Sequence, residues 1–149
     1  MTIIIDRLSQ NDREQWQCLY QSYADFYQVP MSEPTLDQVW QWIFDSSPRL
    51  FALIAKDETG RGVGLMHYRE MLSPLRGTSV GFLDDFFVAP NCRGQGVVDQ
   101  LFDRLRQEAA QQGWSFVRWI TAEDNYRGRS VYDRLAEKTH WQTYQMAVG

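Results

Sequence analysis

The sequence is poor in the residues that build disulfide frameworks and metal clusters. Its 149 residues include only two cysteines and two histidines. Cys18 and Cys92 lie far apart and form no CxxC pair, which favours reduced thiols in a cytoplasmic protein over a disulfide scaffold. His67 and His140 are too few and too isolated for a metal-binding cluster. The sequence therefore predicts a protein without a metal.

Long apolar runs and an excess of positive charge are also missing. No stretch approaches the roughly 18 apolar residues that a membrane span needs, and the apolar run at the N-terminus is too short for a signal peptide. The formal net charge is −4, whereas nucleic-acid-binding proteins usually carry a basic face. We therefore expect neither a membrane nor a nucleic acid as partner. An acidic chain suits a cationic substrate, although many proteins are mildly acidic for solubility alone.

What is present fits one α/β (α+β) domain over residues 1–149, because no linker or repeat divides the chain. Hydrophobic periodicity predicts a mixed sheet flanked by helices. A capping box from Thr35 to Gln38 is expected to open the second helix. The strands are expected at residues 3–8, 50–55, 63–68, 80–88, 116–121 and 141–148, and the helices at 9–27, from 35, 94–112 and 127–138.

A glycine-containing loop stands between the strand at 80–88 and the helix that follows. The first amides of a helix have no internal partner and lie at the positive end of the helix dipole, so they attract anions. Glycines let the backbone approach a pyrophosphate closely, and Arg93 adds a positive charge. Neither a Lys-Ser/Thr pair nor a GxGxxG pattern is present, which argues against other nucleotide loops. The candidate cofactor-binding residues here are Phe86, Phe87, Val88, Arg93, Gly94, Gln95, Gly96, Val97, Val98 and Asp99.

This loop resembles the acetyl-CoA pyrophosphate loop of the GNAT superfamily of N-acetyltransferases, in its Arg/Gln-x-x-Gly-x-Gly/Ala form. The segment Arg93 to Gly96 matches, whereas Val98 stands where the family usually has Gly or Ala. The resemblance implies a mostly antiparallel central sheet with two splayed strands. It also implies that the backbone of the strand ending at Val88 pairs with the pantetheine arm between those strands.

A second block, residues 121–135, resembles a later motif of the same family, in which an Asn is followed seven residues on by a Tyr. The resemblance implies that Asn125 and Ser130 lie along the pantetheine, and that Tyr132 faces the thioester sulfur as a general acid. Gly128 and Ala136 are minor departures from the family pattern.

The stretch Leu-Asp-Asp-Phe-Phe-Val at 83–88 resembles the diamine (spermidine/spermine) acetyltransferases, and residues 119–132 are closer to the histone and polyamine branch. The resemblance implies an acetyl-CoA-dependent N-acetyltransferase that transfers acetyl directly to a primary amine. The amine is expected to be cationic, such as a polyamine or a lysine-type amine. A homodimer is common in this family, but the sequence itself does not determine the oligomeric state.

Two adjacent acids, Asp84 and Asp85, are hard to explain as packing. Strand alternation predicts that they point to opposite faces, and burying an unpaired carboxylate is costly. An alkyl amine with a pKa near 10.4 is neutral in about one molecule in 2,500 at pH 7, so a carboxylate base is useful. The resemblance places Asp84 as that base. The residues expected to bind substrate are Asp84, Asp85 and Tyr27, and one of the two acids is expected to pair with an arginine such as Arg118.

Other functions stay open at this point. A non-catalytic acetyl-CoA-binding sensor would keep the glycine loop but would not need Tyr132 or a cleft carboxylate. An acceptor such as an α-amino acid or an antibiotic amine is a further alternative. An amino acid's carboxylate would favour arginines such as Arg69 or Arg76 near the cleft.

Overall fold

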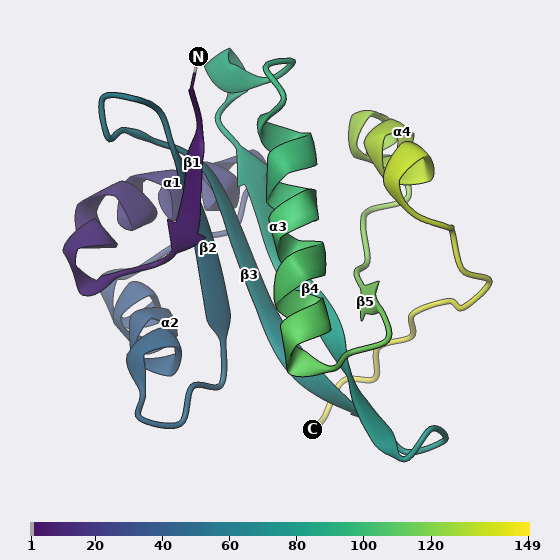
Figure 1. Ribbon diagram of the computed structural model, residues 1–149. Helices are drawn as coiled ribbons and strands as arrows, with labels where there is room; N and C mark the ends of the chain where they lie inside the picture. The colour runs from purple at the N-terminus through teal and green to yellow at the C-terminus, as the bar shows by residue number, and fades with distance from the viewer. Residues whose placement is uncertain (1) are drawn as a thin grey trace. The chain divides into compact units, whose positions relative to one another are not determined.

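The computed structural model describes residues 2–149, which form two compact units, one ending at Trp119 and one spanning Ile120–Gly149. The first unit is a sheet with helices on both faces, and the second holds one helix (Figure 1). In chain order the elements are β1 (Ile4–Arg7), the short 3-10 helix η1 (Gln10–Asp12), α1 (Arg13–Phe26), α2 (Glu33–Phe44), β2 (Phe51–Lys56), β3 (Gly62–Ser73), β4 (Thr78–Val88), the 3-10 helix η2 (Pro90–Cys92), α3 (Val97–Gln112), β5 (Val117–Arg118) and α4 (Tyr126–Leu135).

The five strands lie in the order β1-β2-β3-β4-β5. The first four pair antiparallel with their neighbours, and β5 runs parallel to β4. α3 covers one face of this sheet, while α1 and α2 cover the other (Figure 1). The predicted mixed, mostly antiparallel sheet flanked by helices is confirmed.

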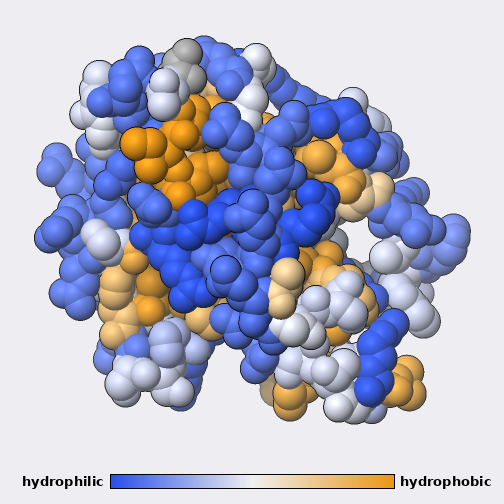
Figure 2. All heavy atoms as spheres, in the orientation of Figure 1, coloured by the Kyte–Doolittle hydropathy of each residue, from blue (hydrophilic) through white to orange (hydrophobic). Residues whose placement is uncertain are grey.

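Each face of the sheet has its own apolar layer. On the α1 and α2 face, Trp16 and Leu36 are fully buried against Leu65 of β3. On the other face, α3 comes so close that a Cβ on Gly64 would lie 2.9 Å from Leu101. Gly64 therefore sets the distance between helix and sheet. The outward side of α3 is polar, as the blue band across Figure 2 shows.

One irregularity in the pairing of β3 with β4 decides how the two acids point. His67 pairs with Asp85, but Tyr68 pairs with Leu83, so β4 carries Asp84 as one extra residue. Such a β-bulge interrupts the alternation of side chains along a strand. Asp85 contacts Tyr20 of α1, and Asp84 contacts Arg69, which lies on the same face of β3 as His67. The prediction that alternation sends the acids to opposite faces was wrong, because both carboxylates lie on the α1 face.

β4 runs beyond its parallel partner. The pairing of β4 with β5 consists of Gly81 with Val117 and Phe82 with Arg118. β5 ends at Arg118, so β4 continues from Leu83 to Val88 without β5 beside it. The parallel pairing with β5 therefore covers only the first part of β4.

Two expected helix starts are corrected. α2 is capped by Ser32, whose side chain accepts a hydrogen bond from the Thr35 amide, so the helix begins ahead of the predicted capping box. α3 begins at Val97 instead of residue 94, because Gly94 and Gly96 have φ of 79° and 82°. A left-handed backbone cannot continue a right-handed helix.

The predicted closing strand at residues 141–148 was also wrong. The structure assigns no strand there, and Trp141, Tyr144, Met146 and Val148 are exposed. Alternating apolar residues indicate a strand only when a neighbouring strand pairs with their backbone. In the described part of the chain, this segment has no such pairing.

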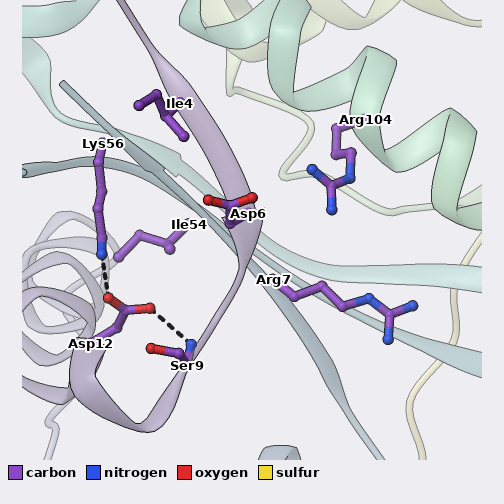
Figure 3. A pocket seen from close by; sticks show the side chains of 8 residues that line it. All are labelled: Ile4, Asp6, Arg7, Ser9, Asp12, Ile54, Lys56 and Arg104. Carbon is purple, nitrogen blue, oxygen red and sulfur yellow. Dashed lines mark hydrogen bonds and ion pairs between the residues drawn. The ribbon is translucent and has the colours of Figure 1, made fainter. Parts of the chain in front are cut away.

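A hollow of about 470 Å³ lies beside β1 (Figure 3). Lys56 forms an ion pair with buried Asp12, whose carboxylate also accepts the Ser9 amide at 2.8 Å. Arg104 donates to the Ile5 carbonyl oxygen at 2.7 Å. The charged side chains in this hollow therefore stabilise the edge of the sheet.

Buried Glu108 ties α3 to β1. Arg7 donates two hydrogen bonds to its carboxylate, at 3.0 and 3.2 Å, and Arg104 adds one at 3.3 Å. These bonds, first those from Arg7, hold the pKa of Glu108 below its ordinary value of 4.5. A lowered pKa stabilises the fold above pH 4.5, and this contribution is lost as the pH falls through the folded-state value.

We predict that Glu108→Gln lowers the free energy of unfolding at pH 7 by about 1–3 kcal/mol, because it leaves two cations without their buried partner. The variant should also lose part of the wild-type decline in stability between about pH 5 and 3. Denaturant titrations across this range measure both effects. Asp103→Asn is the control, because its ion pair with Arg106 on the same helix is exposed. Equal stabilities of Glu108→Gln and wild type at pH 7 would contradict the prediction.

Candidate active site

The glycine loop between β4 and α3 forms an open cradle of backbone. A Cβ added to Gly94 would have no contact within 4 Å. A Cβ added to Gly96 would lie 3.8 Å from Gln100 Nε2. Gly96 is the N-cap of α3 and offers no side chain to cap it. The amides of the first turn thus have no partner within the helix, and this end of the helix attracts an anion. The space and the polarity suit a pyrophosphate.

The side chains around the loop differ in how deeply they are buried. Val97 is fully buried and Val98 half-buried, so both anchor α3 to the sheet, whereas Gln95 and Asp99 are exposed. Gln95 donates from Nε2 to the Asn91 carbonyl oxygen at 3.4 Å. The Arg93 guanidinium lies 6.0 Å from the ring centre of Phe26, at the end of α1. This contact brings the end of α1 beside the loop.

The strand that leads into the loop places its aromatic residues on both faces. Phe86 packs edge-to-face on Phe102 of α3, with ring centres 5.0 Å apart. Phe87 lies on the other face, 6.1 Å from the ring of Tyr23. Val88 is buried opposite Gly64. These contacts hold the end of β4 in place, beyond the point at which its pairing with β5 stops.

Asp84 and Asp85 occupy different environments. Asp84 accepts a hydrogen bond from Arg69 Nε at 2.8 Å, and the Arg69 guanidinium stacks on the Phe82 ring at 5.0 Å. The expected acid–arginine pair therefore exists, but its arginine is Arg69 and not Arg118. Asp85 instead points towards α1 and is largely buried, with 20% of its side chain exposed.

A chain of hydrogen bonds leads from Asp85 into the core. His67 Nδ1 lies 2.8 Å from Asp85 Oδ2, and Trp16 Nε1 donates to His67 Nε2 at 2.9 Å. Tyr20 donates its hydroxyl to the same Asp85 oxygen at 3.1 Å. Trp16 and His67 have no exposed surface. No local pattern in the sequence indicates this chain of hydrogen bonds, because the pairing of His67 with Asp85 depends on the strand register.

Tyr20 and Tyr23 of α1, and Tyr27 directly after the helix, lie near the carboxylate of Asp85. Burial, followed by the charge of Asp85, raises the pKa of Tyr20, Tyr23 and Tyr27. Burial alone would raise the pKa of Asp85 as well, but hydrogen bonds from His67, Tyr20 and Tyr23 bring it below its ordinary value. The phenols thus stay protonated and the carboxylate stays ionised at neutral pH.

Tyr27, an expected substrate-binding residue, is 40% exposed at the end of α1, and its ring centre lies 4.9 Å from that of Tyr23. We name the set Asp84, Asp85, Tyr20, Tyr23 and Tyr27 the acidic–aromatic cluster.

The second unit carries the other predicted site residues. Asn125 caps α4, because its Oδ1 accepts the Gly128 amide at 3.2 Å and its Nδ2 donates to Thr121 at 2.9 Å. Tyr132 is half-buried and follows Asn125 by seven residues, which is close to two helical turns, so both lie on one side of α4. Ser130 is exposed. The side chain of Asn125 thus has a capping role that the sequence analysis missed.

Within residues 2–149, no group of three or more His, Cys, Asp or Glu side chains is arranged to hold a metal ion. In the same range, no helix is long and apolar enough to span a bilayer.

Comparison with known proteins identifies the family. The profile of the acetyltransferase (GNAT) family matches residues 16–136. The D-amino-acid N-acetyltransferase HPA3 of Saccharomyces cerevisiae is 26% identical over 144 residues, which cover 96% of this chain and 89% of that protein. The chain therefore belongs to the GNAT family, and it is an acetyl-CoA-dependent N-acetyltransferase.

Solved structures share the fold. The ribosomal-protein-alanine N-acetyltransferase of Brucella melitensis is 24% identical with a TM-score of 0.81, covering 99% of this chain and 100% of that one. The aminoglycoside N-acetyltransferase AAC(6')-Iy, in complex with a bisubstrate analogue built on CoA, is 18% identical with a TM-score of 0.87 and full coverage of both chains. Relatives of this fold thus differ in the acceptors that their names state.

We predict that Gly96→Glu weakens acetyl-CoA binding about tenfold or more, because it places an anion at the cradle. Isothermal titration calorimetry measures the Kd. Gly60→Glu is the control, since Gly60 has a similar φ of 85° in the β2–β3 turn and nothing within 4 Å of an added Cβ. Unchanged affinity in Gly96→Glu would exclude this loop as the pyrophosphate site.

We also predict that Tyr132→Phe lowers kcat by about 10²-fold, the usual scale of general acid catalysis, and leaves acetyl-CoA affinity unchanged. The substitution removes only the hydroxyl, so packing is kept. Tyr126→Phe is the control, because Tyr126 is 73% exposed at the start of the same helix. A Tyr132→Phe enzyme with wild-type kcat would show that another donor protonates the thiolate.

Proposed function

We propose that this acetyltransferase acts on a positively charged primary amine, such as a polyamine or a lysine-type amine. The observation that carries the proposal is the acidic–aromatic cluster beside the end of β4. Two carboxylates lie on one face of the sheet, one of them held ionised by its hydrogen bonds. Tyrosine rings beside carboxylates are well suited to bind an ammonium group.

In this proposal acetyl-CoA binds through the loop from Arg93 to Asp99. Its pyrophosphate lies on the first amides of α3, and its pantetheine arm follows the outer side of β4 at Phe86–Val88. Asn125 and Ser130 are proposed to contact the same arm. A backbone amide near Val88 would polarise the thioester carbonyl. The strand and the helix thus fix the acyl donor, while the cluster fixes the acceptor.

Direct transfer then needs proton transfers at both the amine nitrogen and the thiolate sulfur. Asp84 accepts a proton from the ammonium, directly or through water, which leaves a neutral amine. The nitrogen lone pair attacks the thioester carbon, and the C–S bond breaks with its electron pair on sulfur. Tyr132 gives its proton to the thiolate and takes up the second proton of the amide nitrogen, and Asp84 releases its proton to water. The balance is R–NH₃⁺ plus acetyl-CoA giving R–NH–acetyl, CoA–SH and H⁺.

A second candidate acceptor is an α-amino acid. Asp84 and Arg69 present opposite charges side by side, 2.8 Å apart, and a zwitterion carries the complementary pair. The name of the yeast relative, a D-amino-acid N-acetyltransferase, favours the same class. In this case Arg69 binds the carboxylate of the substrate, and an acid of the cluster binds its ammonium group.

Arg69→Gln distinguishes between the two acceptor classes, because it should change the KM of the acceptor differently for each class. For a cationic amine, loss of Arg69 removes a competing positive charge, so KM should stay equal or fall. For an α-amino acid, KM should rise about tenfold or more. The assay follows CoA release with spermidine, a lysine peptide, an aminoglycoside and both enantiomers of an α-amino acid. Arg76→Gln is the control, since Arg76 lies in the β3–β4 turn and bonds Ser73.

Asp84→Asn tests the base in the same assay. The variant should fold normally, lose kcat with cationic amines, and recover partly at high pH as the amine deprotonates. A preference for the α-amino acid, with Asp84→Asn close to wild type, would contradict the cationic-amine proposal. Tight acetyl-CoA binding without turnover of any acceptor would favour a sensor instead.

A further inference from the structure

We propose that Trp16 and His67 are positioning residues that hold Asp85 as a fixed anion for the ammonium group of the acceptor. The inference rests on the proposed function, because it takes an amine to bind at the acidic–aromatic cluster. It assigns the two acids different tasks. Asp84 remains the proposed base, and Asp85 binds the positively charged ammonium group of the acceptor.

The hydrogen bonds allow only one protonation state of His67. An indole nitrogen can donate but cannot accept, so His67 Nε2, 2.9 Å from Trp16 Nε1, must be the acceptor. A neutral imidazole carries one proton, which therefore lies on Nδ1 and points to Asp85 Oδ2 at 2.8 Å. Asp85 accepts this bond and the one from Tyr20. The Trp16 indole thus determines the tautomer of His67, and the Nδ1–H of that tautomer holds the Asp85 carboxylate in one orientation.

Trp16 also opposes a second proton on His67. Protonation of Nε2 would set two N–H groups against each other in a site with no exposed surface. The groups that face His67 are Trp16 and Tyr20 from α1 and Asp85 from β4, and only Asp85 is charged. His67 cannot pass a proton inward either, because the indole has no lone pair to accept one. Its use is to orient Asp85.

The surroundings of Asp85 suit binding better than proton transfer. His67, Tyr20 and Tyr23 all stabilise the ionised form, and Tyr27 and Asp84 complete the set of titratable neighbours. Asp85 Oδ2 already accepts hydrogen bonds from His67 and Tyr20, whereas Asp84 accepts its bond from Arg69 and from neither of these groups. Loss of the Asp85 charge should therefore appear in the KM of the amine more than in kcat.

Nitrogen-15 NMR of the two histidines tests the tautomer without any activity. In wild type at pH 7, His67 should carry its proton on Nδ1 and none on Nε2, and exposed His140 gives a second histidine signal for comparison. In Trp16→Phe, Nε2 loses its donor, so its nitrogen-15 shift should move towards that of an imidazole nitrogen without a hydrogen bond. Trp114→Phe is the matched control, because Trp114 is also buried and donates its Nε1–H to Glu70. A wild-type His67 with its proton on Nε2 overturns the inference.

Kinetics test whether the position of Asp85 matters. Two double variants are compared, and both contain Trp16→Phe so that no buried indole N–H is left without an acceptor. In Trp16→Phe/His67→Asn, the asparagine amide can replace the Nδ1–H donor to Asp85. In Trp16→Phe/His67→Leu, that donor is lost. KM for spermidine should be about tenfold higher in the leucine variant, with kcat and the KM for acetyl-CoA nearly equal in the two. In an Asp85→Asn background the difference should vanish, because the effect acts through that carboxylate. Equal KM values in both double variants, or a difference that persists in Asp85→Asn, overturns the inference.

The two experiments separate this inference from the proposed function. If wild type acetylates no cationic amine, the proposed acceptor class is wrong, and the NMR result still decides whether Trp16 fixes His67. If wild type acetylates spermidine but the leucine variant keeps its KM, the acceptor class stands and the positioning role fails.

Discussion

One extra residue in β4 controls the geometry of the whole site. Because Asp84 has no partner in β3, the strand resumes its pairing at Asp85 opposite His67. A regular strand would send one of the two carboxylates towards α3, into an apolar layer with no cation to receive it. The bulge instead collects both acids beside α1. The tyrosines of α1 and Arg69 of β3 then give each acid its own partners.

The α1 face shows how a polar chain can be buried at low cost. A buried imidazole and a largely buried carboxylate are expensive unless each hydrogen-bonding atom is satisfied. Here Trp16, His67 and Asp85 satisfy one another in sequence, and the chain ends at the carboxylate, which keeps some exposed surface. The apolar residues around the chain keep water from its inner end. The same burial that stabilises the fold therefore orients a charge at the surface.

Much of the architecture could be predicted from the sequence. Hydrophobic periodicity located the helices and most strands, and the strand–glycine–helix pattern marked the loop at Gly96. The pairing of residues distant in sequence could not be predicted in this way. No local signal reveals that Asp84 is a bulge or that His67 faces Asp85, because both facts depend on the register between two strands. The prediction of a strand at 141–148 was wrong for a related reason, since alternation of apolar residues describes one strand and does not show whether a partner strand pairs with it.

The open side of β4 has a consequence for the handling of this protein. The pairing of β4 with β5 ends at Phe82, so from Leu83 to Val88 the strand pairing of the first unit is with β3. An unpaired strand edge attracts other extended chains and is a common starting point for aggregation. A ligand that lies along this edge covers the same backbone groups, so it competes with such pairing. If acetyl-CoA binds along β4 as proposed, acetyl-CoA or CoA in the storage buffer should reduce self-association of the protein.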